Sequence, residues 1–191
     1  MSVVLASGSP RRRELLEMLR VPGLEIVPSH GAECPPEGAT PEETVKALAR
    51  AKAAEVAEHR AAEDVIIGAD TLVVLDGEML GKPRSEEMAR EMLRALSGRS
   101  HEVWTGVCLI RPGEELAEAE RTVVSFRALE DREIDAYIAT GEPMDKAGAY
   151  GAQGLGALFV EGIEGDFFNV MGLPVLRLSR MLERFGVRFF C

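Results

Sequence analysis

Three consecutive arginines, Arg11, Arg12 and Arg13, stand at the start of a predicted helix. Ser9 is a typical N-cap residue and Pro10 suits the first helical position. Cations at this end of a helix are unfavourable by about 0.3–1 kcal/mol, because the helix dipole is positive there. Either the arginines are simply exposed to solvent, or they bind an anion such as phosphate together with the backbone N–H groups of the turn before the helix.

A carboxylate and an ammonium group lie on the two arms of a predicted hairpin. The segment VIIGADTLVVLDGEML has an Asp-Gly pair, a strong hairpin signal, between apolar residues. A two-residue loop pairs Leu75 with Glu78 and, further out, brings Thr71 opposite Lys82, so that Asp70 is one step away. An ordinary ion pair would also explain this arrangement. The small or rigid residues on either side, Gly68, Ala69, Gly81 and Pro83, favour a site that a ligand can approach.

Lysine is rare in this chain, which has eighteen arginines and four lysines. Where lysine replaces the usual arginine in a tight loop, a compact charge that can contact phosphate oxygens is indicated. This interpretation applies to Lys82 and Lys146, whereas chance explains Lys46.

Two further residues have a binding and a structural interpretation. Gln153 lies in the glycine-rich segment AGAYGAQGLG. Its amide carries a donor and an acceptor side by side, which matches the imide edge of uracil or thymine, although it could equally bond to the loop backbone. Glu33, in a predicted loop, is either a metal ligand or a surface acid.

Composition excludes several classes of protein. The net charge of −10 argues against a general nucleic-acid binder. We find no secretion signal and no apolar run near the roughly 20 residues that span a bilayer, so no membrane association is expected. Three cysteines without metal-type spacing indicate a reducing compartment, and we expect a cytoplasmic protein. The serine-hydrolase, zinc-protease and P-loop patterns do not occur.

These residues must be positioned by strands that alternate with helices and hairpins. This pattern predicts one α/β domain over residues 1–191, with a mixed β-sheet and flanking helices. Strands are expected at 3–6, 65–75, 101–110, 121–126, 157–160 and 187–190, and helices at 10–20, 40–59, 85–96, 131–140 and from 174 to before 186.

Along nearly its whole length the chain resembles the Maf family of nucleotide pyrophosphatases. The segments that carry the resemblance are SGSPRRRELL, ARAKA, GADTLVVLDGEMLGKP, SGRSHEVWTGV, GEPMDKAGAYGAQG and GDFFNVMGLP, together with Glu33. The resemblance implies a fold of the inosine-triphosphate-pyrophosphatase type with two lobes around a cleft, a homodimer, and a divalent cation, Mg²⁺ or Mn²⁺, as cofactor.

The combination of Arg12, Thr71 and Gln153 is similar to the branch of the family that hydrolyses dTTP and UTP. The implied reaction gives the nucleoside monophosphate and pyrophosphate, with Asp70 as the proton acceptor that activates water. Asp70 would also share the metal with Glu33. The implied substrate-binding residues are Ser9, Arg12, Arg13, Lys52, Thr71, Lys82, Lys146 and Gln153.

Two alternatives accompany this interpretation. Modified pyrimidine triphosphates could be the substrates of a house-cleaning reaction by the same enzyme. Because the family is also associated with inhibition of septum formation, a regulatory binding protein is the competing class.

Overall fold

The computed structural model describes residues 1–190, and it contains a seven-stranded mixed sheet in the order β2-β1-β3-β5-β6-β7, with β4 paired to β3 off this path. The strands are β1 (Val3–Leu5), β2 (Leu24–Ile26), β3 (Val65–Leu75), β4 (Glu78–Leu80), β5 (Ser100–Arg111), β6 (Glu114–Phe126) and β7 (Val160–Glu164). β1 is parallel to β2 and β3, whereas the β3–β4 and β6–β7 pairs are antiparallel. The expected mixed α/β fold is confirmed.

Helices and short 3₁₀ turns connect the strands. They are α1 (Pro10–Met18), α2 (Pro41–Ala57), α3 (Glu86–Leu96), α4 (Asp131–Ala139), α5 (Phe167–Met171), α6 (Val175–Arg184), η1 (Glu142–Asp145), η2 (Ala147–Ala149) and η3 (Leu155–Phe159). α2 begins with a complete capping box, in which Thr40 and Glu43 satisfy each other's backbone N–H groups.

The chain forms two compact units. The first comprises Met1–Asp70, Thr105–Glu120 and the residues from Gly172 onwards, and the second comprises Thr71–Trp104 and Arg121–Met171. The boundaries fall inside β3, β5 and β6, so each of these strands contributes residues to both units. The single domain expected over residues 1–191 stays a prediction.

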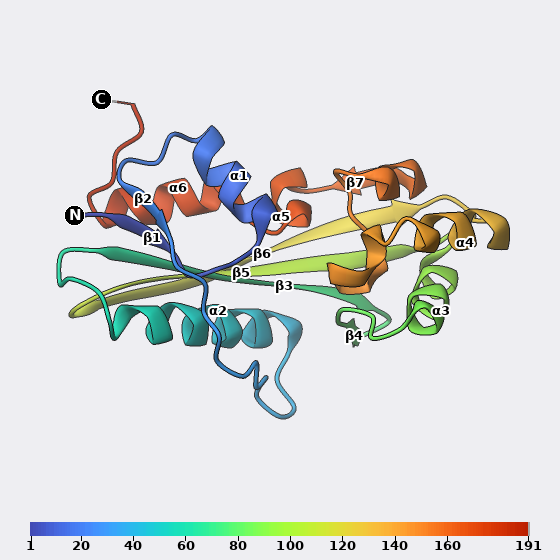
Figure 1. Ribbon diagram of the computed structural model, residues 1–191, viewed down its shortest axis with the longest axis horizontal. Coiled ribbons are helices and arrows are strands. Elements are labelled where there is room, and N and C mark those ends of the chain that lie inside the picture. The colour runs from blue at the N-terminus through green and yellow to red at the C-terminus, as the bar shows by residue number, and fades with distance from the viewer. Residues whose placement is uncertain (191) are drawn as a thin grey trace. The chain divides into compact units, whose positions relative to one another are not determined.

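In the first unit, α2 covers one face of the sheet and α1 and α6 cover the other (Figure 1). The α2 side is a core of small and β-branched side chains: Val4, Ala6, Ala49, Ala53, Val56, Ile66 and Cys108. Gly68 of β3 permits the close approach, because a Cβ there would lie 2.0 Å from the Ala49 carbonyl oxygen. Gly68 therefore does not leave space for a ligand, as the sequence suggested. The backbone of α2 occupies this space instead.

In the second unit, α3 and α4 pack with the sheet around a core that includes Val73, Leu93, Ile134 and Phe126. Aromatic rings meet edge to face within this core. The ring pairs are His101–Phe126, His101–Tyr150, Phe126–Tyr150, Phe126–Phe159 and Tyr137–Phe159.

The predicted helices agree with the structure, but several predicted strands do not. The strand expected at 157–160 is mostly the 3₁₀ turn η3, with β7 following it, and β6 begins at Glu114 rather than at residue 121. The hairpin register is confirmed where Leu75 pairs with Glu78, but β4 ends at Leu80, so the ladder does not reach Lys82. The expected strand at 187–190 is wrong, and the short strand β2 was not predicted. Both segments are too short for a clear alternation of apolar and polar residues.

Candidate active site

The arginines at the start of α1 have different environments. Arg12 is 9% exposed, and its Nε donates to the Gly172 carbonyl oxygen at 2.8 Å and its Nη1 to Ser7 Oγ at 3.2 Å. Arg13 is exposed and pairs with Glu17 at 2.7 Å. Arg12 is therefore buried within the first unit, whereas Arg13 is exposed to solvent.

The turn before α1 keeps its polar groups available. Ser9 is the N-cap residue, but its side chain makes no capping hydrogen bond, and no acidic residue lies in the first helical turn. The Ser9 N–H donates to Ser7 Oγ at 3.2 Å. A helix N-terminus is a favourable place for an anion.

Lys52, Glu33 and Asp70 form a cluster of charges in the first unit. The Lys52 ammonium lies 2.5 Å from Asp70 Oδ1 and 2.7 Å from Glu33 Oε1. The Asp70 and Lys52 side chains are 10% and 16% exposed, whereas Glu33 is 55% exposed. The pairing of Asp70 with Lys52 was not predicted from the hairpin, because it depends on α2 packing across β3.

Arg12 also belongs electrostatically to this cluster. Burial lowers the pKa of its guanidinium, while the nearby carboxylates of Asp70 and Glu33 act to raise it. The first unit therefore concentrates two cations, Arg12 and Lys52, and two carboxylates in one place. Such a group can hold a charged substrate and also accept a proton from it or from water.

The loop that carries Glu33 is anchored to α2. Glu55 accepts hydrogen bonds from the backbone N–H groups of His30 and Gly31, at 2.8 and 2.9 Å. A pocket of about 310 Å³ lies between this loop and α2, and Glu33 and Lys52 line it. Sequence reasoning missed Glu55, which resembles any other exposed helical glutamate.

The carboxylates of Glu33 and Asp70 fit a divalent cation such as Mg²⁺. Mg²⁺ prefers oxygen ligands and is usually held by one or two carboxylates together with substrate phosphates, rather than by a complete protein cage. Among residues 1–190 there is no group of three or more acidic, histidine or cysteine side chains that could hold a metal. The donor set therefore suits a cation that arrives with a phosphorylated substrate.

Within the second unit, the loop that carries Lys146 is hydrogen-bonded to the loop that carries Lys82. The Gly148 N–H donates to the Gly81 carbonyl oxygen at 3.1 Å, which joins the segment of Lys146 to that of Lys82. Lys82 is exposed. The Lys146 ammonium donates to the Glu142 carbonyl oxygen and to Asp145 Oδ1, at 2.7 and 2.6 Å, so Lys146 stabilises its own loop.

Thr71 and Gln153 also belong to the second unit. Thr71 is half-buried in β3, directly after Asp70 in the chain. Gln153 is exposed, as are Gly154 and Leu155 after it, whereas Gly151 and Ala152 before it are buried. An exposed amide on a fixed turn is suited to hydrogen bonding with a ligand.

Comparisons with known proteins show which family the chain resembles along its length. The family described as Maf-like protein matches residues 2–185. A dTTP/UTP pyrophosphatase of Bacillus cereus (strain AH187) is 48% identical over 97% of this chain and 96% of that protein. A dTTP/UTP pyrophosphatase of Bacillus mycoides (strain KBAB4) is 50% identical over 96% of this chain and 95% of that protein.

Among solved structures, the Ham1 protein of Staphylococcus aureus matches with a TM-score of 0.45 and 16% identity, over 66% of this chain and 72% of that one. In the part of the chain that the structure describes, no helix is both long and apolar enough to cross a membrane.

Proposed function

The chain belongs to the Maf family, and we propose from this premise that it hydrolyses dTTP and UTP to the nucleoside monophosphate and pyrophosphate. The observation that carries the proposal is the cluster of Asp70, Lys52 and Glu33 beside the buried Arg12. This cluster combines groups that hold phosphate oxygens with a carboxylate that accepts a proton.

The reaction requires water to cleave the anhydride between the α- and β-phosphates. The triphosphate repels any anionic nucleophile, so its charge must be neutralised and a water molecule oriented. Arg12 and Lys52 neutralise and hold the phosphates, and Asp70 accepts the proton of the attacking water. Lys52 donates to Asp70 Oδ1 at 2.5 Å, which fixes the orientation of that carboxylate before substrate binds.

Glu33 and Asp70 would hold the divalent cation, Mg²⁺ or Mn²⁺. When bound, the cation supplies positive charge to the phosphate oxygens and makes coordinated water more acidic. Removal of the metal with a chelator should abolish hydrolysis, and addition of either cation should restore it.

The remaining residues bind the substrate. Ser9 contributes from the helix N-terminus, and Arg13 and Lys82 contribute exposed positive charge. Thr71 and Gln153 select the base, with the Gln153 amide pairing with the imide edge of uracil or thymine. Lys146, whose ammonium also bonds to Asp145 and to the Glu142 carbonyl oxygen, contributes a further positive charge.

Asp70→Asn tests the assignment of the proton acceptor. The substitution keeps the shape of the side chain but removes its basicity, so hydrolysis of UTP should fall by orders of magnitude while nucleotide binding remains. Pyrophosphate release measures the first quantity and calorimetry the second. Near-normal turnover would remove Asp70 from this role.

Gln153→Glu tests the assignment of base recognition. The carboxylate cannot donate, so hydrolysis of uracil and thymine nucleotides should weaken more than that of the others. A pyrophosphate-release screen over canonical and modified triphosphates measures the preference, and an equal loss for every base would contradict the assignment.

We also infer from the family resemblance that the protein acts in the cytoplasm as a homodimer. Light scattering coupled to size-exclusion chromatography tests the oligomeric state directly.

A further inference from the structure

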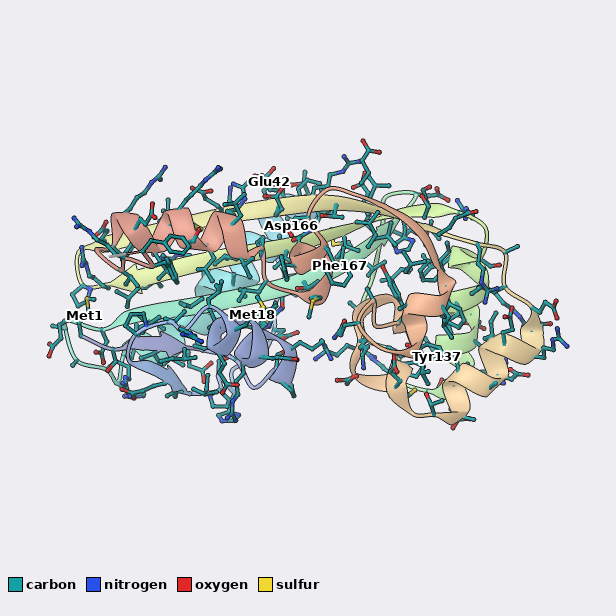
Figure 2. All side chains as sticks on the ribbon, turned by 90° about the horizontal axis from the view of Figure 1, so that it is seen from above. Met1, Met18, Glu42, Tyr137, Asp166 and Phe167 are labelled. Carbon is teal, nitrogen blue, oxygen red and sulfur yellow. The ribbon has the colours of Figure 1, made fainter. Side chains whose placement is uncertain are left out.

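We propose that Glu142, acting together with the Tyr137 hydroxyl, is a positioning residue for base selection, because the two side chains hold the turn that presents Gln153. The inference rests on the proposed role of Gln153 in reading the base. It concerns residues of the second unit only, and Tyr137 is labelled on α4 in Figure 2.

The backbone on both sides of Gln153 is bonded to these two side chains. The Gly151 N–H donates to the Tyr137 hydroxyl at 3.1 Å. The Leu155 N–H donates to Glu142 Oε2 at 3.0 Å, and the Gly156 N–H donates to Glu142 Oε1 at 3.2 Å.

The two side chains are also bonded to each other. The Tyr137 hydroxyl donates to Glu142 Oε1 at 2.8 Å. One carboxylate and one hydroxyl therefore satisfy three backbone donors within the six residues 151–156. Charge-assisted hydrogen bonds of this kind are stronger than neutral ones.

The glycines of the turn are required by the space that Glu142 and Tyr137 occupy. A Cβ at Gly154 would lie 2.4 Å from Glu142 Oε1, and a Cβ at Gly156 would lie 2.8 Å from the Tyr137 hydroxyl oxygen. Neither glycine has a positive φ. At Gly154 and Gly156 glycine therefore reflects close packing around the carboxylate and the hydroxyl, whereas Gly148 of the same segment has a positive φ of 67°.

Glu142 is itself held in place. α4 ends at Ala139, and Gly141, two residues further on, turns the chain into η1 with a φ of 75°. The Glu142 N–H donates to Thr140 Oγ1 at 3.2 Å, and its carbonyl oxygen accepts from the Lys146 ammonium at 2.7 Å. With its backbone anchored on both sides, the carboxylate is a fixed acceptor for the turn.

The protonation states suit these bonds. Burial acts to raise the pKa of Glu142, but the donors Leu155 N–H, Tyr137 hydroxyl and Gly156 N–H together lower it below its ordinary value. Burial and the neighbouring Glu142 raise the pKa of Tyr137. At neutral pH the glutamate is thus an anion and the tyrosine remains a donor.

Gln153, Gly154 and Leu155 are the residues of this turn that face solvent, and of these three Gln153 alone has a side chain that can hydrogen bond. Ala152 is 7% exposed and Gly151 and Gly156 are buried, while Gln153 is exposed. A fixed turn with one exposed amide loses little freedom when it binds a base, and a preorganised contact discriminates between ligands better than a mobile one.

The experiment compares hydrolysis of UTP and CTP by the full chain with Mg²⁺. Cytosine presents a donor where uracil presents an acceptor, so their ratio of kcat/KM reports on the amide of Gln153. In Glu142→Gln and in Tyr137→Phe, the preference for UTP should narrow by about 10-fold, as expected for a displaced contact group.

A double-variant cycle separates positioning from general stability. When either substitution is added to Gln153→Ala, the preference should narrow no further, because the contact is already lost. Glu133→Gln is the matched control: it removes a charged acceptor of α4, bonded to Arg127 and the Glu130 N–H, that does not contact the turn. It should leave the preference unchanged.

Three results would overturn the inference. The first is an unchanged preference for UTP over CTP in folded Glu142→Gln and Tyr137→Phe. The second is a loss of preference in the Gln153→Ala background as large as the loss in the chain that keeps Gln153. If Gln153→Ala itself keeps the preference, both base reading by Gln153 and this inference are wrong. Should Glu142→Gln fail to fold, Tyr137→Phe alone decides, because it removes only the hydroxyl and keeps the ring beside Phe159.

Discussion

Gly68→Ala should destabilise the protein and at the same time disturb the cluster of Lys52, Asp70 and Glu33. The hydrogen of Gly68 faces the backbone of α2, where a Cβ would lie 2.0 Å from the Ala49 carbonyl oxygen and 2.8 Å from the Ala53 nitrogen. Lys52 lies between these two helical residues in the chain. The helix that must move to admit the methyl group is therefore the helix that carries Lys52.

The size of the effect follows from these distances. Ordinary van der Waals contact begins near 3.4 Å, so α2 must retreat by roughly 1.4 Å. Backbone atoms cannot rotate away as a side chain would, so we expect a loss at the upper end of overpacking costs, about 3 kcal/mol. The same shift should weaken the 2.5 Å contact between Lys52 and Asp70 and reduce hydrolysis by about 10- to 100-fold.

Urea unfolding measures the loss of stability, and pyrophosphate release from UTP measures the loss of hydrolysis. Gly162→Ala is the matched control, since Gly162 lies in a strand with open space around its Cβ position and no positive φ. It should change the free energy of unfolding by less than about 0.5 kcal/mol. If Gly68→Ala behaves like this control, the close packing of α2 on β3 is not what positions Lys52.

Two further predictions concern buried polar groups. Arg12→Lys keeps the charge but not the planar guanidinium that bonds to both Gly172 and Ser7, so urea unfolding should show a free energy of unfolding lower by about 1–3 kcal/mol. An unchanged midpoint would mean that these two hydrogen bonds do not stabilise the protein. Burial lowers the pKa of His101 to about 4, so the unfolded chain binds a proton that the folded chain excludes. Stability should therefore be complete above about pH 6.5 and fall by up to about 1.4 kcal/mol per pH unit down to about pH 4. The slope of the free energy of unfolding against pH should be smaller in His101→Phe than in the unsubstituted protein. If the two slopes are identical, groups other than His101 cause the pH dependence.

The sequence was informative where local rules decide the outcome. The Asp-Gly turn predicted the pairing of Leu75 with Glu78, and the start of α2 followed from Thr40, Pro41 and Glu43. These features depend on neighbouring residues along the chain, which a sequence displays directly.

The partners of the charged groups could not be predicted in this way. Asp70 was expected near Lys82, yet the 2.5 Å partner is Lys52 from a helix eighteen residues away. The three arginines at the start of α1 looked equivalent in sequence, although packing buries Arg12 and leaves Arg13 in solvent. Such outcomes depend on which face of a helix meets the sheet.

Glu142 and Tyr137 were missed for a related reason. A glutamate before a proline and a tyrosine in an amphipathic helix are ordinary residues, and the signal lay instead in the glycines that pack against them. Spacing of glycines can thus mark the position of a buried acceptor that the sequence does not otherwise reveal.

The bond from Arg12 to the Gly172 carbonyl oxygen spans 160 positions of the chain. During synthesis, which runs from the N-terminus, this arginine stays without that acceptor until all but about the last tenth of the 191 residues has been made. A truncated product that ends before Gly172 would therefore carry all of the candidate site residues and still lack the acceptor that holds the Arg12 guanidinium, so we expect a prematurely terminated chain to be inactive.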